Sequence, residues 1–143
     1  MAANAENQFD ASEFLEGLMF LALDHGVYSR RDGGAIVPFV MTVTDGKREL
    51  HRFVAEPYEV GVAHAKAFAS KLSLQTNVYA VAYDGYVTLG TTKHDAIVVT
   101  GAERGKGKGY LLAQRYISTE DTKSIESVGN PIYLGREDAL FEP

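Results

Sequence analysis

Apolar residues recur at helical spacing in the first part of the chain. They form two adjacent stripes, one through Phe14, Leu18 and Leu21 and the other through Leu15, Met19 and Ala22. Residues three, four and seven positions apart share one side of an α-helix, so this pattern predicts an amphipathic helix. Asp10 can cap the start of this helix, and Gly26 favours its end.

A hairpin and a second helix are predicted next. Residues 36–44 and 48–54 are rich in β-branched and aromatic side chains, and Asp45-Gly46 stands between them. A two-residue Asp-Gly loop between such runs is a strong hairpin signal. Pro57 suits the first turn of a helix that runs to about Leu72, with a stripe made mostly of alanine.

A second hairpin of the same design is predicted at Asp84-Gly85, between residues 78–83 and 86–89. In that register one face carries Tyr79, Tyr83 and Tyr86, and the other is small and apolar. The apolar face consists of Val78, Ala80, Ala82, Val87 and Leu89. We expect the alanine-rich helix to cover this apolar face.

The remaining chain reads as strands at 96–102 and 110–117 around a glycine-rich turn at 105–109. Residues 118–143 read as an irregular segment with an edge strand at 132–134, and residues 1–8 as a flexible tail. The order is α-β-β-α-β-β-β-β in a single domain over residues 1–143. Short links between strands favour a mainly antiparallel sheet, a hairpin followed by a meander, in a two-layer α+β domain with both helices on one face.

Composition narrows the function classes. The 143 residues contain no cysteine, which excludes disulfides, thiolate metal sites and a cysteine nucleophile. The net charge of −5 argues against nucleic acid as the partner. The apolar run at 18–23 is too short to span a bilayer and has no basic residue before it. We therefore expect a cytoplasmic protein with no membrane partner.

Polar residues in the predicted strands suggest a polar site. Its members are Asp95, Glu103, Arg104, Gln114 and Arg115. An inward-facing arginine needs a carboxylate partner, because an unpaired buried charge is costly. The alternative interpretation is a structural ion pair or a solvent-facing strand.

The glycine and lysine stretch at 101–109 offers a second candidate. Its bare backbone amides and the cations Arg104, Lys106 and Lys108 can hold a small anion, although the P-loop spacing is missing. The alternative is a solvated hairpin tip. The four histidines show no metal-binding spacing, so neither a metal nor a cofactor is expected.

The predicted tyrosine face, Tyr79, Tyr83 and Tyr86, is the third candidate. Tyrosine is enriched at interfaces and is also a good strand former. No nucleophile or metal motif points to catalysis. The leading hypothesis is therefore a binding or assembly module that acts as a homo-oligomer. The alternative is a small-molecule-binding protein or small enzyme, with a polar pocket formed by strands 95–104 and 110–117.

Overall fold

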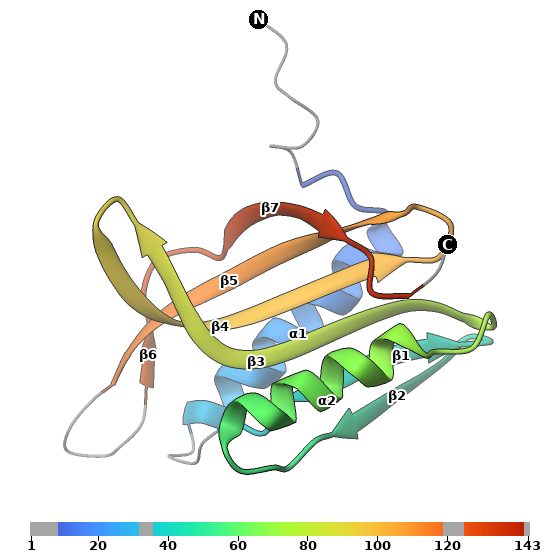
Figure 1. The fold of residues 1–143 in the computed structure, drawn as a ribbon. Coiled ribbons are helices and arrows are strands. Elements are labelled where there is room, and N and C mark those ends of the chain that lie inside the picture. The colour runs from blue at the N-terminus through green and yellow to red at the C-terminus, as the bar shows by residue number, and fades with distance from the viewer. Residues whose placement is uncertain (1–8, 32–35, 119–124, 142–143) are drawn as a thin grey trace, which may run out of the picture.

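The structure is a computed structural model that describes residues 9–31, 36–118 and 125–141. Figure 1 shows two helices and a twisted sheet. In chain order the elements are α1 (Glu13–Arg31), β1 (Phe39–Thr44), β2 (Lys47–Arg52), α2 (Tyr58–Ser70), β3 (Thr76–Leu89), β4 (Thr92–Glu103), β5 (Lys108–Ser118), β6 (Ile125–Ser127) and β7 (Ile132–Asp138). The predicted tail at 1–8 lies outside the described residues.

The predicted α+β class, the antiparallel sheet and the order of its elements are confirmed. The strands are arranged β2-β1-β3-β4-β5-β6, and β7 also pairs with β5. Every paired neighbour is antiparallel. The predicted edge strand at 132–134 forms the first part of β7. Because β2 and β3 both run antiparallel to β1, they are parallel to each other, and α2 crosses between them.

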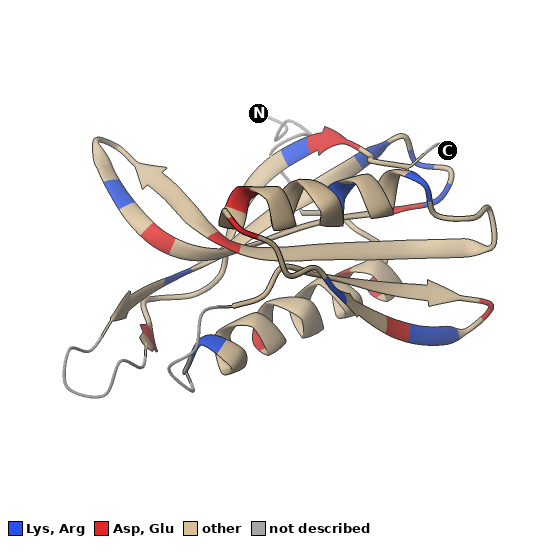
Figure 2. Ribbon diagram, turned by 60° about the horizontal axis from the view of Figure 1, so that its bottom comes forward, with Lys and Arg blue, Asp and Glu red and all other residues tan. Residues whose placement is uncertain are grey.

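The two helices cover opposite faces of the sheet, which corrects the prediction that they share one face. Val78, Ala80 and Ala82 pack in the cluster beneath α1, whereas Tyr79 and Val81 pack in the cluster beneath α2. Figures 1 and 2 show α1 and α2 on opposite sides of the sheet. The central strand is apolar on both faces, and such a strand needs cover on both. The alanine-rich helix therefore lies on Tyr79 and Val81, not on the small apolar face assigned to it.

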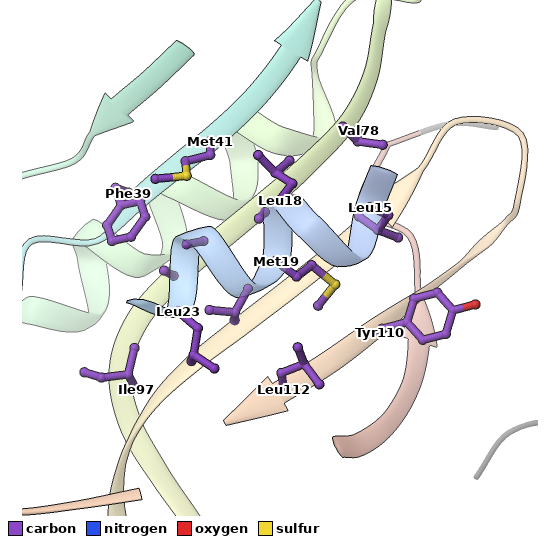
Figure 3. Close-up of a cluster of buried hydrophobic side chains, with 14 of the residues drawn as sticks. Leu15, Leu18, Met19, Leu23, Phe39, Met41, Val78, Ile97, Tyr110 and Leu112 are labelled. Atoms are coloured by element: carbon purple, nitrogen blue, oxygen red, sulfur yellow. The ribbon is translucent and has the colours of Figure 1, made fainter. Parts of the chain in front are cut away.

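The larger core lies beneath α1 (Figure 3). Leu15, Leu18, Met19 and Leu23 reach from the helix toward strand residues that include Phe39, Ile97 and Leu112. Phe14 and Leu21, from the other predicted stripe, stay exposed. Burial of Leu15, Leu18, Met19 and Leu23 contributes to the hydrophobic stabilisation of this face.

Both predicted ends of α1 differ in the structure. Ser12 caps the helix, because its Oγ accepts the N–H of Leu15 at 3.2 Å, and Asp10 instead accepts a hydrogen bond from Tyr110 at 2.8 Å. Gly26 does not end the helix, which continues to Arg31. A Cβ at Gly26 would lie 2.8 Å from Cγ2 of Ile97, so this glycine allows the helix to approach the sheet closely.

The two Asp-Gly pairs behave differently. Asp45 and Gly46 have φ values of 51° and 80° and join Thr44 to its partner Lys47, so the first predicted hairpin is confirmed. Asp84-Gly85 lies in the middle of β3, and the turn comes at 90–91. The second predicted hairpin is therefore wrong, and the strand continues, with a bend, through the position assigned to its loop.

Candidate functional site

The continuation of β3 beyond residue 83 creates an arm that extends past β1. The pairing between β1 and β3 ends at Phe39 and Ala82, whereas β3 and β4 stay paired as far as Leu89 and Thr92. Figure 1 shows this arm turning away from the plane of β1. Beyond residue 82 none of the described strands lies beside this edge of β3, so its backbone groups need other partners.

Tyr58 provides one such partner. This residue begins α2, and its hydroxyl accepts the backbone N–H of Asp84 at 2.7 Å. The start of the helix is thereby fixed to the bend of β3. Burial is the main cause that raises the pKa of Tyr58 to about 12, so the hydroxyl is neutral near pH 7.

A pocket of about 530 Å³ lies at this bend. Four tyrosines and three carboxylates from α2, β3, β4 and β5 line it: Tyr58, Tyr83, Tyr86, Tyr116, Glu59, Asp84 and Asp95. Its volume falls in the range of pockets that hold small molecules. The described residues that line it include no lysine or arginine.

Asp84 is the centre of the polar contacts at the pocket. Its Oδ1 accepts a hydrogen bond from the Tyr116 hydroxyl at 2.6 Å, and its Oδ2 lies 3.5 Å from Nε of Arg30 on α1. Burial raises the pKa of Asp84 above its ordinary value, while Tyr116 and Arg30 oppose that rise. Burial and the bond to Asp84 also raise the pKa of Tyr116, so this hydroxyl remains a donor.

Three of the tyrosine rings already lie beside a cation of the chain. Lys93 Nζ is 3.9 Å from the ring centre of Tyr86, Lys66 Nζ is 5.1 Å from that of Tyr83, and the Arg30 guanidinium is 5.6 Å from that of Tyr116. Aromatic faces attract cations through their quadrupole. Each of these three rings therefore has a positively charged side chain of the protein as a neighbour.

Members of two predicted sites meet at this pocket. Asp95 came from the polar site, and Tyr83 and Tyr86 came from the tyrosine face. The third tyrosine, Tyr79, is only 1% exposed; its hydroxyl accepts the N–H of Leu140, and its ring packs on Phe141. Tyr86 lies on the opposite face of β3 from Tyr79 and Tyr83, because the predicted turn that would have aligned the three rings is not formed. The pocket at the bend takes side chains from both faces of the strand, so Tyr83 and Tyr86 both line it.

The other polar candidates do not converge. Arg104 donates to the backbone carbonyls of Leu72, Ser73 and Thr76 and stacks on Phe141. These contacts hold the segment after α2 against the C-terminal part of the chain.

Gln114 and Arg115 alternate to opposite faces of β5. The Gln114 side chain donates to the carbonyls of Arg115, Val128 and Gly129 and so supports the segment between β6 and β7. Arg115 lies beside the same segment, because a Cβ on Gly129 would be 3.0 Å from its Nη2. Gln114 and Arg115 therefore both lie against the segment that connects β6 and β7. They do not form a shared site with Asp95.

Glu103 belongs to a second polar pocket, of about 360 Å³, next to the glycine-rich turn. Lys106, Lys108 and Arg136 supply positive charge there, and Asp10 joins Glu103 as an acid. Lys108 also pairs with Asp138 at 2.7 Å. Arg104 lies elsewhere, so the predicted trio of cations is not assembled, and an anion at Lys106 and Lys108 stays a prediction.

Metal and membrane sites receive no support from the described part of the chain. Across residues 9–31, 36–118 and 125–141, no three histidine or carboxylate side chains come together as metal ligands would. The described helices include none with the length and apolar character needed to cross a membrane.

One of the four histidines, His25, packs edge-on against Phe39. Burial, with Arg52 nearby, lowers the pKa of His25.

Comparison with protein-family models, with curated proteins and with solved structures found no match for this chain. The case for function therefore rests on the pocket itself.

Sequence reasoning missed Arg30, Tyr58, Asp84 and Tyr116. Asp84 was assigned to a turn, and the other three reach it only through contacts between distant segments.

Proposed function

We propose that the protein binds a small organic cation, such as an aromatic amine, in the pocket at the bend of β3. The observation that carries the proposal is the lining of four tyrosines and three carboxylates. Tyrosine rings and carboxylates both favour a positive ligand, the first through the ring quadrupole and the second through charge and hydrogen bonding. This proposal is a form of the small-molecule-binding alternative. It places the pocket at the bend of β3, whereas the sequence-based alternative used strands 95–104 and 110–117.

The roles of the carboxylates differ within this proposal. Asp84 is occupied by Tyr116 and Arg30 and holds the floor of the pocket in place. Asp95 and Glu59 are exposed at the pocket wall, and no hydrogen bond joins either side chain to the described protein residues. We assign to them the contact with the charged group of the ligand, and to Tyr83 and Tyr86 the contact with its apolar body.

Titration calorimetry with three ligands of the same shape tests the proposal. Benzylamine is a cation near neutral pH, benzyl alcohol is neutral and benzoate is an anion. Benzylamine is expected to bind with a dissociation constant in the micromolar to millimolar range, as suits so small a ligand. Benzyl alcohol should bind more weakly, and benzoate should not bind. Equal binding of benzoate and benzylamine would overturn the proposal.

Two variants locate the binding. Asp95→Asn keeps the shape of the side chain and removes its charge, and it should weaken benzylamine binding by about tenfold. Glu126→Gln is the matched control, because Glu126 is an exposed carboxylate on β6 that does not line the pocket. If both variants bind like the unmodified protein, or if both weaken binding equally, the ligand is not held by Asp95.

A further inference from the structure

The second polar pocket, next to the glycine-rich turn, combines charges of both signs. Its volume is about 360 Å³, and none of its described lining residues belongs to the pocket at the bend of β3. The lining comes from the segment before α1, from α1, from the end of β4, from the connection between β4 and β5, and from β5 and β7. Its basic members are Lys106, Lys108 and Arg136, and its acidic members are Asp10 and Glu103. A ligand in this pocket therefore meets both kinds of charge.

Contacts within the protein hold part of this lining in place. Leu15 and Tyr110 are 1% and 7% exposed and supply its apolar part. The Tyr110 hydroxyl donates to Oδ1 of Asp10 at 2.8 Å, and the guanidinium of Arg136 lies 4.8 Å from the centre of the Tyr110 ring. One acid and one base thus have fixed positions at the pocket. A site that is already ordered loses less conformational entropy when a ligand binds.

Several of the charged groups have no partner in the described part of the protein. Lys108 pairs with Asp138 at 2.7 Å. Among the described residues, no hydrogen bond or ion pair involves the side chains of Glu103, Lys106 or Arg136. The Nε atom of Arg136 is buried and is one of the described polar atoms without a hydrogen-bond partner. Glu103 and Arg136 are only partly exposed, and charges that are partly withdrawn from water gain most from a partner.

We propose that this pocket binds a small zwitterion, a ligand that carries an ammonium group and a carboxylate group together, such as an α-amino acid. Glu103 pairs with the ammonium group, and Lys106 and Arg136 pair with the carboxylate through charge-assisted hydrogen bonds. A simple anion would meet the like charges of Glu103 and Asp10, and a simple cation would meet those of the basic residues. A zwitterion offers an unlike charge to both sets.

Three ligands built on one carbon chain test the proposal. L-Norvaline carries both charged groups, pentanoate lacks the ammonium group, and butylamine lacks the carboxylate. Backbone amide shifts of the ¹⁵N-labelled protein at Glu103, Gly105 and Lys106 report binding in this pocket. L-Norvaline should bind with a dissociation constant in the millimolar range, and each of the other two about tenfold more weakly.

Two results would overturn the proposal. One is the absence of shifts around Lys106 with L-norvaline at its solubility limit. The other is binding of pentanoate that equals or exceeds that of L-norvaline, because the pocket would then be a simple anion site. Shifts at Tyr58 and Asp84 report the pocket at the bend of β3, so the two proposals succeed or fail separately.

Variants separate the two halves of the site. Glu103→Gln should weaken L-norvaline binding about tenfold and should not weaken pentanoate binding, whereas Lys106→Gln should weaken both. The matched controls are Glu126→Gln and Lys71→Gln, which alter exposed charges that do not line the pocket. Circular dichroism checks that the variants remain folded. If Glu103→Gln weakens both ligands equally, or neither, Glu103 does not hold the ammonium group and the proposal is wrong.

Discussion

The two helices cover the same sheet from opposite sides, and they do so with different side chains. On the α1 side, leucines and a methionine fill the space above the strands. On the α2 side, the buried helix positions are Gly61, Ala65 and Ala69. A Cβ at Gly61 would lie 2.8 Å from the carbonyl oxygen of Phe53, so α2 meets its neighbours almost backbone to backbone.

This difference bears on where a binding site can form. Interdigitated large side chains leave few voids, and such a face tolerates little change in volume. A short helix of small residues covers less of its face, and the β3 arm continues past its first turn, where the pocket lies. The α1 face supplies most of the stabilising burial, and the end of the α2 face supplies the candidate site.

The largest expected effect is on the α1 face. Met19→Ala removes a fully buried side chain from the middle of the core and should lower the free energy of unfolding by about 2–5 kcal/mol. Leu21→Ala, on the same helix but exposed, should cost much less. Urea denaturation measures both. Equal losses would show that depth of burial on α1 does not set the stability of this face.

An opposite change in volume probes the α2 face. Ala65→Leu forces a larger side chain between the helix and the sheet and should destabilise the fold by about 1–3 kcal/mol. Ala63→Leu, at an exposed position of the same helix, should change stability by less than about 0.5 kcal/mol. If Ala65→Leu is neutral, α2 is not held as close to the sheet as the structure places it.

The pH dependence of stability tests the network at the pocket floor. Burial raises the pKa of Asp84, so between its ordinary value of 3.8 and its raised value the folded protein holds a proton that the unfolded chain has released. The contribution of this carboxyl is therefore greatest below the ordinary value and falls as pH rises through the window.

Asp84→Asn removes this titration. The free energy of unfolding of the unmodified protein, minus that of the variant, should decrease with rising pH, by no more than about 1.4 kcal/mol per pH unit. Urea denaturation across this range measures the difference. A difference that increases with pH would mean that Tyr116 and Arg30 outweigh burial at Asp84.

The smallest expected effect concerns the contact between α2 and the bend of β3. Tyr58→Phe removes the acceptor for the Asp84 N–H and should cost about 0.5–1.5 kcal/mol. Tyr28→Phe, which alters an exposed hydroxyl on α1, is the matched control and should have almost no effect on the thermal midpoint. Equal effects would remove the special role given to the Tyr58 hydroxyl.

How far the sequence could predict this molecule depends on the range of the interactions. Asp45-Gly46 forms the predicted hairpin because the decisive contacts are local and both residues adopt positive φ. Asp84-Gly85 has the same composition, but Arg30, Tyr58 and Tyr116 from three other elements engage Asp84 within a continuous strand. Such contacts leave no trace in local spacing, so the centre of the candidate site could not be predicted.

The placement of the helices follows the same rule. Helical spacing predicted where α1 and α2 form, but not which face each covers. Tyr79 and Val81 are as buried as Val78 and Ala80, so the strand pattern demanded cover on both sides without assigning a helix to either. The predicted tyrosine face was wrong in part, because it depended on a turn at Asp84-Gly85 that does not form. Its other two members, Tyr83 and Tyr86, line the pocket instead.

The central claim is that a small cation occupies the pocket at the bend of β3. The most direct measurement is the change in backbone amide chemical shifts of the ¹⁵N-labelled protein on addition of benzylamine, with benzoate as the matched anion. Benzylamine should shift the amides of Tyr58, Asp84, Gly85 and Asp95, and benzoate should leave them unchanged. Shifts that cluster around Lys106 and Lys108, or no shifts with either ligand, would contradict the account.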